Sequence, residues 1–137
     1  MNPKIRTREV ARNSYANYLK RSDECFTAAK ASLSKGNWNA AAICAIHSCI
    51  SACDALCIYF LGRRHSGANH TDAVVLLEMT GIERPELTTN VNRLRKILSV
   101  KNMAEYEERL ARRAEAESMI RDTERFVAFV RSRLPTE

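Results

Sequence analysis

The sequence predicts an all-α fold, a single-domain antiparallel bundle of four to five helices. Apolar residues recur at three- and four-residue steps along most of the chain, and no strand-like alternation is sustained over several residues. Only four glycines and three prolines interrupt the 137 residues, so long helices joined by short connections are expected. A chain of this length is one domain that can bury a real core.

The first two helices are expected at about residues 14–34 and 39–61. The first carries apolar residues at helical spacing, and "KGNW" ends it, because Gly36 can adopt a positive φ. The second is apolar nearly all round, which predicts a central helix that is buried on more than one side. The polar stretch "GRRHSGANH" follows it and is predicted to be a loop.

Three further helices complete the expected bundle. The third is "DAVVLLEMT", with Asn69 or Thr71 as its cap. Pro85 separates it from the fourth, which starts near residue 88 and carries apolar residues on one face. The last spans about 112–134. The segment "SVKNMAEYEE" is interpreted as a polar group between the fourth helix and the last.

Charge and cysteine content bear on compartment and partners. The chain has 22 basic and 16 acidic residues, which modestly favours anionic partners such as nucleic acid. An odd number of cysteines, five, without a signal peptide favours a reducing cytoplasm. Residues 39–62 carry no Lys or Arg and are long enough to cross a bilayer. However, Asp54 near their middle costs about 2.5–3.5 kcal/mol on insertion scales, so no membrane span is expected.

The cysteines of "CISACDALC" invite a metal-site interpretation. Cys49, Cys53 and Cys57 lie four residues apart with Cys44 upstream, so all four belong to one helix. Three thiolates along a straight helix span about 12 Å, too far to close a tetrahedron. Cys25 is the only cysteine in another segment. We therefore expect these cysteines to pack as small hydrophobic residues, with no metal and no cofactor.

Three polar residues form a stripe on the second helix, namely His47, Ser51 and Asp54. A buried carboxylate without a partner is costly, so Asp54 should meet a cation or a donor from another element. The stripe is compatible with a structural network and with a functional role. One straight helix does not supply the converging geometry of a nucleophilic triad.

The loop after this helix is strongly basic, with Arg63, Arg64, His65 and His70. It is compatible with an anion site and with a solvated basic turn. No phosphate-binding glycine loop occurs in the sequence.

Three stretches resemble HEPN-domain proteins. "YLKRSDECFTAAKASLSKGNWNAAAICAIHSCISACDALCIYFLGRR" resembles their opening two helices, "KNMAEYE" their Lys/Arg-Asn-x-x-Asp/Glu-Tyr segment, and "AESMIRDTERFVAFVRSRL" their final helix. His70 lies where many members place a histidine that opens the third helix. The resemblance covers residues 14–134 and leaves 1–13 as a basic N-terminal extension. It implies an all-α bundle, usually a homodimer, built around a groove.

Many HEPN proteins are metal-independent ribonucleases with an Arg-x4-6-His motif, or toxins paired with small nucleotidyltransferases. By position, Lys101 falls at the motif arginine and Tyr106 at its histidine. Lysine can hold a phosphate as a point charge. Tyrosine, with a reference pKa of about 10, is a poorer base at neutral pH than histidine at about 6.5. The pair Arg64-x5-His70 also has the motif spacing, but it lies between different helices, and we interpret it as coincidental.

The resemblance implies a cytoplasmic, dimeric HEPN-like protein that binds RNA, a nucleotide or a protein partner in an inter-helix groove and is catalytically weak or inactive. One alternative is an active metal-independent ribonuclease, including the toxin of a pair with a cognate antitoxin or nucleotidyltransferase. Another is a helical adaptor without a ligand. The candidate catalytic residues are Lys101, Tyr106, His70 and His47, and the candidate ligand-binding residues are Asp54, Ser51, Arg64, Asn102 and Glu105.

Overall fold

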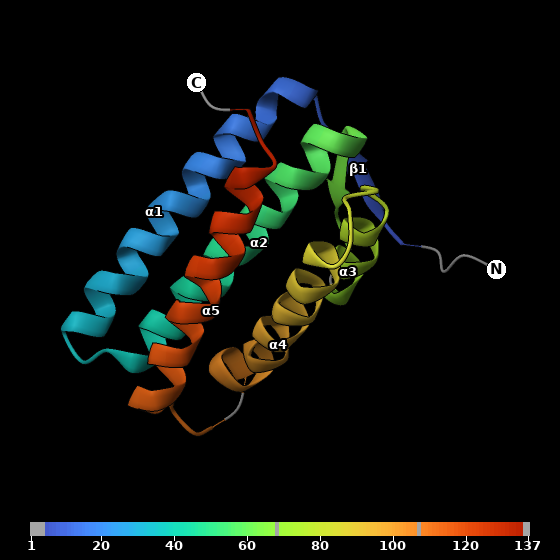
Figure 1. The fold of residues 1–137 in the computed structure, drawn as a ribbon. Helices are drawn as coiled ribbons and strands as arrows, with labels where there is room; N and C mark the ends of the chain where they lie inside the picture. The colour runs from blue at the N-terminus through green and yellow to red at the C-terminus, as the bar shows by residue number, and fades with distance from the viewer. Residues whose placement is uncertain (1–4, 68, 107, 136–137) are drawn as a thin grey trace.

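The computed structural model describes residues 5–67, 69–106 and 108–135, and for 102–106 it describes the backbone alone. Five α-helices confirm the predicted all-α bundle, and a two-stranded ribbon accompanies them (Figure 1). The described elements in chain order are β1 (Thr7–Glu9), a 3-10 turn (Arg12–Ser14), α1 (Tyr15–Ser34), α2 (Trp38–Leu61), β2 (Arg63–His65), α3 (Thr71–Glu78), α4 (Glu86–Tyr106) and α5 (Arg113–Ser132).

Helices α1 and α2 form an antiparallel hairpin, and α5 runs along the same pair (Figure 1). Small residues let the two helices approach closely. The Ser22 hydroxyl donates to the carbonyl oxygen of Ser48 at 2.8 Å, and the Ser48 hydroxyl donates to that of Ser22 at 2.8 Å. Both serines are fully buried, so this reciprocal pair satisfies polar groups that burial would otherwise leave without water.

Helix α2 is the centre of the bundle, as its uniform apolarity predicted. Three of its four cysteines face the core, since Cys49, Cys53 and Cys57 are each at most 1% exposed, whereas Cys44 is half-buried. The Cys49 thiol donates to the Thr123 hydroxyl of α5 at 3.2 Å, and burial raises the pKa of Cys49 to about 12. These thiols therefore act as packing groups at neutral pH.

Helix α2 is also the one described helix that is long and apolar enough to cross a membrane, with a mean hydropathy of 1.8. Of its most apolar window, 83% is buried inside the bundle. The central helix of a soluble protein passes the same test of length and composition.

The ribbon of β1 and β2 was not predicted. Gly62, with φ 69°, ends α2 and turns the chain into β2, which pairs antiparallel with β1. Residues 7–9 of the expected N-terminal extension thus pair with β2, and 63–65 of the expected loop form a strand. Strands of three residues are too short to show an alternating pattern.

Helix α4 begins earlier and ends later than expected. The carbonyl oxygen of Pro85 accepts from the Thr89 amide at 3.0 Å, so proline stands at the helix start, where its missing N–H is tolerated. No Gly or Pro occurs between Glu86 and Tyr106, so no helix-breaking residue interrupts α4 over this whole range. The interpretation of "SVKNMAEYEE" as an inter-helix segment is therefore wrong for residues 99–106, and Lys101 is a helical residue.

Candidate functional site

A chain of three polar side chains links α2, β2 and the start of α3. The Asp54 carboxylate, on buried α2, lies 3.3 Å from Nδ1 of His65. The other ring nitrogen of His65, Nε2, lies 2.9 Å from Nδ1 of His70, which directly precedes α3. Asp54 and His65 are 6% and 3% exposed, whereas His70 is half-buried. The expected partner of the Asp54 carboxylate is thus His65 of the same chain.

For neutral imidazole rings, this geometry assigns the tautomers of both histidines. A carboxylate can only accept, so His65 donates from Nδ1–H and its Nε2 becomes an acceptor. His70 then donates from Nδ1–H, which makes its Nε2 the nitrogen with the lone pair. A carboxylate that accepts a hydrogen bond from one nitrogen of a histidine fixes the tautomer and the orientation of the ring. The arrangement therefore orients the His70 ring through His65 and Asp54, with its Nε2 as the proton-accepting atom.

Arg64 is held next to this chain by α1. Its Nε donates to the Tyr18 hydroxyl at 3.0 Å, and its Nη1 donates to the carbonyl oxygen of His65 at 2.9 Å. The guanidinium of Arg21 lies 4.8 Å from the centre of the same Tyr18 ring. Arg64 therefore contacts the backbone carbonyl of His65, whereas His70 contacts its ring. The interpretation of the spacing Arg64-x5-His70 as coincidental stays a prediction.

The three residues of the predicted polar stripe on α2 differ in burial. Ser51 is buried, as Asp54 is, but His47 is exposed. Residues at these positions share a face, yet the ribbon and α3 pack over the C-terminal half of α2. His47 therefore lies two helical turns away from Asp54, outside the buried chain of Asp54, His65 and His70.

A pocket of about 430 Å³ lies between α3 and α4. Thr71 lines it from α3, and Arg95 and Ser99 line it from α4. The start of α3, directly after His70, thus faces the half of α4 that carries Lys101. Lys101 is half-buried. The side chains of three other predicted residues lie outside the described residues, namely Asn102, Glu105 and Tyr106.

Sequence reasoning did not select His65 or Tyr18 as site residues. His65 was seen only as part of a basic loop, because nothing in "GRRHSG" shows that β1 pairs there and turns the ring inward. The signal that could have found it is the buried carboxylate of Asp54, which required a donor. Tyr18 looked like an ordinary apolar position of α1, and only the contact with Arg64 gives it a polar role.

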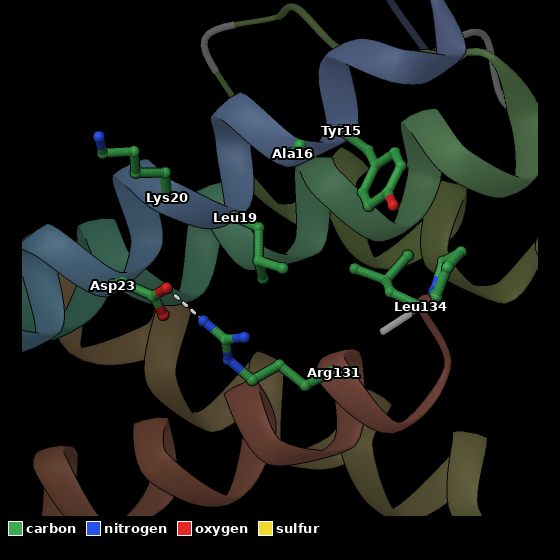
Figure 2. A pocket seen from close by; sticks show the side chains of 8 residues that line it. Tyr15, Ala16, Leu19, Lys20, Asp23, Arg131 and Leu134 are labelled. Atoms are coloured by element: carbon green, nitrogen blue, oxygen red, sulfur yellow. Dashed lines mark hydrogen bonds and ion pairs between the residues drawn. The ribbon is translucent and has the colours of Figure 1, made fainter. Parts of the chain in front are cut away.

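Two other cavities lie away from this site. Figure 2 shows a pocket of about 430 Å³ between α1 and the C-terminal end of α5, with Leu19 and Leu134 as its apolar wall. Asp23 and Arg131 form an ion pair across it, which joins the two helices. None of the predicted site residues lines this pocket.

The other cavity, of about 710 Å³, lies at the far end of α2, beside Trp38. The Arg113 guanidinium lies 5.6 Å from the centre of the indole ring. A Cβ at Gly36, where φ is 78°, would stand 3.7 Å from the ring. Along α2, Trp38 lies about 24 Å from Asp54, because each helical residue adds about 1.5 Å.

Among the described residues, no group of three His, Cys, Asp or Glu side chains is arranged to hold a metal ion. No curated protein matches the chain. The family model described as "HEPN domain" matches residues 15–133, so that β1 lies before the matched residues. Because this match covers well over half of the sequence, the chain belongs to the HEPN-domain family.

Proposed function

We propose that this HEPN protein binds RNA at the site formed by β2, α3 and α4 and cleaves it as a metal-independent endoribonuclease. The observation that carries the proposal is the hydrogen-bonded chain from Asp54 through His65 to His70. It supplies a histidine base where Tyr106, at the family position, offers a poor one. The proposal therefore favours the ribonuclease alternative over a catalytically inactive binding protein.

In the proposed reaction, Nε2 of His70 takes the proton of a ribose 2′-hydroxyl. The 2′-oxygen forms a bond to the adjacent phosphorus while the bond from phosphorus to the 5′-oxygen breaks. The 5′-oxygen takes a proton from water and leaves as a hydroxyl, and the other product ends in a 2′,3′-cyclic phosphate. His65 and Asp54 hold the His70 ring and stabilise its protonated form.

A cation is also needed, because negative charge builds up on the phosphate oxygens during the attack. Lys101 is the candidate for this role, since its half of α4 faces the start of α3. Arg64 binds the RNA backbone beside the reacting group. The net charge of +6 favours an anionic polymer as the substrate.

The test is cleavage of a fluorescently labelled single-stranded RNA by the purified protein in EDTA. We expect His70→Ala to lower the rate at least about 100-fold, because general acid–base catalysis contributes about 10² to 10⁴ in rate. Lys101→Ala should also slow the reaction, and Tyr106→Phe should leave most of it. The same strand with 2′-deoxyribose throughout should not be cleaved, since it lacks the nucleophile.

The outcomes separate the hypotheses. Cleavage that persists in His70→Ala at the wild-type rate would indicate another site or a contaminating nuclease. Loss of cleavage in His47→Ala but not in His70→Ala would identify His47 as the base and contradict the assignment of that role to His70. RNA binding without cleavage by the wild type would favour the inactive binding protein, and neither binding nor cleavage would favour the adaptor without a ligand.

The partners implied by the family also belong to the proposal. We propose a cytoplasmic homodimer, with a cognate antitoxin or nucleotidyltransferase as the partner in a toxin–antitoxin pair. Light scattering coupled to size-exclusion chromatography measures the dimer directly. Growth arrest on expression, relieved by a co-expressed neighbouring gene product, tests the toxin role.

A further inference from the structure

The register of the ribbon places two arginines directly opposite each other. Arg8 of β1 pairs with Arg64 of β2. The Ser66 amide donates to the carbonyl oxygen of Arg6, and the Val10 amide donates to that of Gly62. These bonds flank the pair at two-residue steps, so Arg8 and Arg64 form a hydrogen-bonded pair whose Cα atoms stand about 5.5 Å apart. Their side chains leave the ribbon on the same face.

Two like charges directly opposite each other destabilise a ribbon. In the part of the chain that the structure describes, no ion pair compensates Arg8, Arg64 or the nearby Arg21. Arg64 is nevertheless fixed by its bonds to Tyr18 and to the His65 carbonyl, while Arg8 is exposed. A fixed guanidinium next to an exposed one, with no acidic partner among the described residues, is an arrangement that an anion would stabilise.

We infer that Arg8 and Arg64 together bind a phosphate group of the RNA strand. This inference rests on the proposed function and adds to it a binding residue from outside the residues matched by the family, since Arg8 precedes residue 15. The Arg8 guanidinium can donate two parallel hydrogen bonds to phosphate oxygens, and Nη2 of Arg64, which neither of its two described bonds uses, can donate to the same group. Successive side chains of β2 point to opposite faces, so Arg64 faces away from the buried side of His65. The phosphate held here is therefore a neighbour of the one that is cleaved, and the pair anchors the strand.

The binding test uses a single-stranded 2′-O-methyl RNA, which keeps every phosphate but lacks the attacking hydroxyl. Its dissociation constant is measured over a range of salt concentrations for the wild type, Arg8→Ala and Arg8→Glu. The slope of log affinity against log salt should fall by about 0.7 in Arg8→Ala, because one phosphate contact is lost. The matched control is Arg125→Ala, which removes an exposed arginine from α5 and should keep the slope. An unchanged slope in both Arg8 variants would overturn the inference.

A stability measurement separates binding from a structural role. Arg8→Glu places opposite charges across the ribbon, so its melting temperature should stay level or rise by about 1–3 °C while RNA binding falls. A melting temperature that falls together with binding in both Arg8 variants would make Arg8 a structural residue and would overturn the inference.

The inference and the proposed function can fail separately. Arg8-dependent binding of the 2′-O-methyl strand without cleavage of ordinary RNA would contradict the proposed ribonuclease activity and support phosphate binding by Arg8 and Arg64. If the wild type cleaves RNA and both Arg8 variants bind the strand as tightly as the wild type, phosphate binding by Arg8 is contradicted and the proposed activity is not. Inorganic phosphate that raises the melting temperature in an Arg8-dependent way, with no binding of the strand, would identify a site for small phosphates and overturn the RNA anchor.

Discussion

His65 and His70 share one hydrogen bond, 2.9 Å from Nε2 of the first ring to Nδ1 of the second, across the turn between β2 and α3. The first ring is buried against Asp54 and the second reaches the half-buried start of α3. Loss of the middle group of such a chain leaves both outer groups without their partner.

The first prediction concerns that middle group. His65→Ala should lower the free energy of unfolding by about 3 kcal/mol, because the Asp54 carboxylate would remain buried without a donor. The double variant Asp54→Asn with His65→Ala should lose less than the sum of the two single changes, since the buried charge is gone. Urea denaturation followed by circular dichroism measures all three. Additive losses would show that the two groups do not interact.

The second prediction concerns the contact between α1 and α2. Ser22→Ala removes the hydroxyl that donates to the Ser48 carbonyl, whereas the Ser22 carbonyl that accepts from Ser48 remains, and it should cost about 0.5–1.5 kcal/mol of unfolding free energy. Ser99→Ala is the matched control, because its exposed hydroxyl bonds only to the Lys96 carbonyl of its own helix. It should change stability by at most about 0.5 kcal/mol. Equal effects would mean that the buried pair contributes nothing beyond a surface serine.

The third prediction concerns thiol reactivity. Cys25 and Cys44 are half-buried, whereas the other three cysteines are buried in the core. A hydrogen bond with Cys57 together with burial raises the pKa of Cys53, and burial raises that of Cys49 to about 12. A thiol-titrating reagent at pH 8 should therefore react first with Cys25 and Cys44, and with all five thiols only in denaturant. Fast reaction of Cys49 in the native protein would contradict this packing.

The fourth prediction concerns acid stability. Hydrogen bonds from Arg109 and from the Arg112 amide lower the pKa of Glu115 from 4.5 to about 2. A carboxyl group with a lowered folded pKa stabilises the protein above its unfolded pKa, and this contribution is lost as the pH falls from about 4.5 to about 2. Glu115→Gln should remove that part of the acid dependence and should be less stable than the wild type at pH 7. Identical acid denaturation curves would show that the ion pair is fully screened by solvent.

Much of the helical bundle was predictable because each helix has a local signal. The apolarity of α2 on every side predicted its central place, and Gly36 predicted the turn before it. The early start of α4 was missed, since Pro85 can either precede a helix or occupy its first turn. Sequence alone does not choose between the two.

The site was predictable only in part. The need of Asp54 for a partner follows from the cost of burying a charge, and that reasoning led correctly to a donor from another element. The identity of the donor depends on the pairing of Arg8 with Arg64, which no local pattern records. Matching this sequence to the family motif by position selected Lys101 and Tyr106. It could not select His65, because the motif includes no residue that this ribbon holds.

Trp38 is the only tryptophan of the chain, and it stands at the end of α2 that is remote from His65 and His70. Its fluorescence therefore reports on the junction of α1, α2 and α5 and is insensitive to ligands or substitutions at the histidines. Emission from this residue can certify that each site variant is folded before any assay with RNA begins. The protein thus carries its own folding control for experiments on the proposed site.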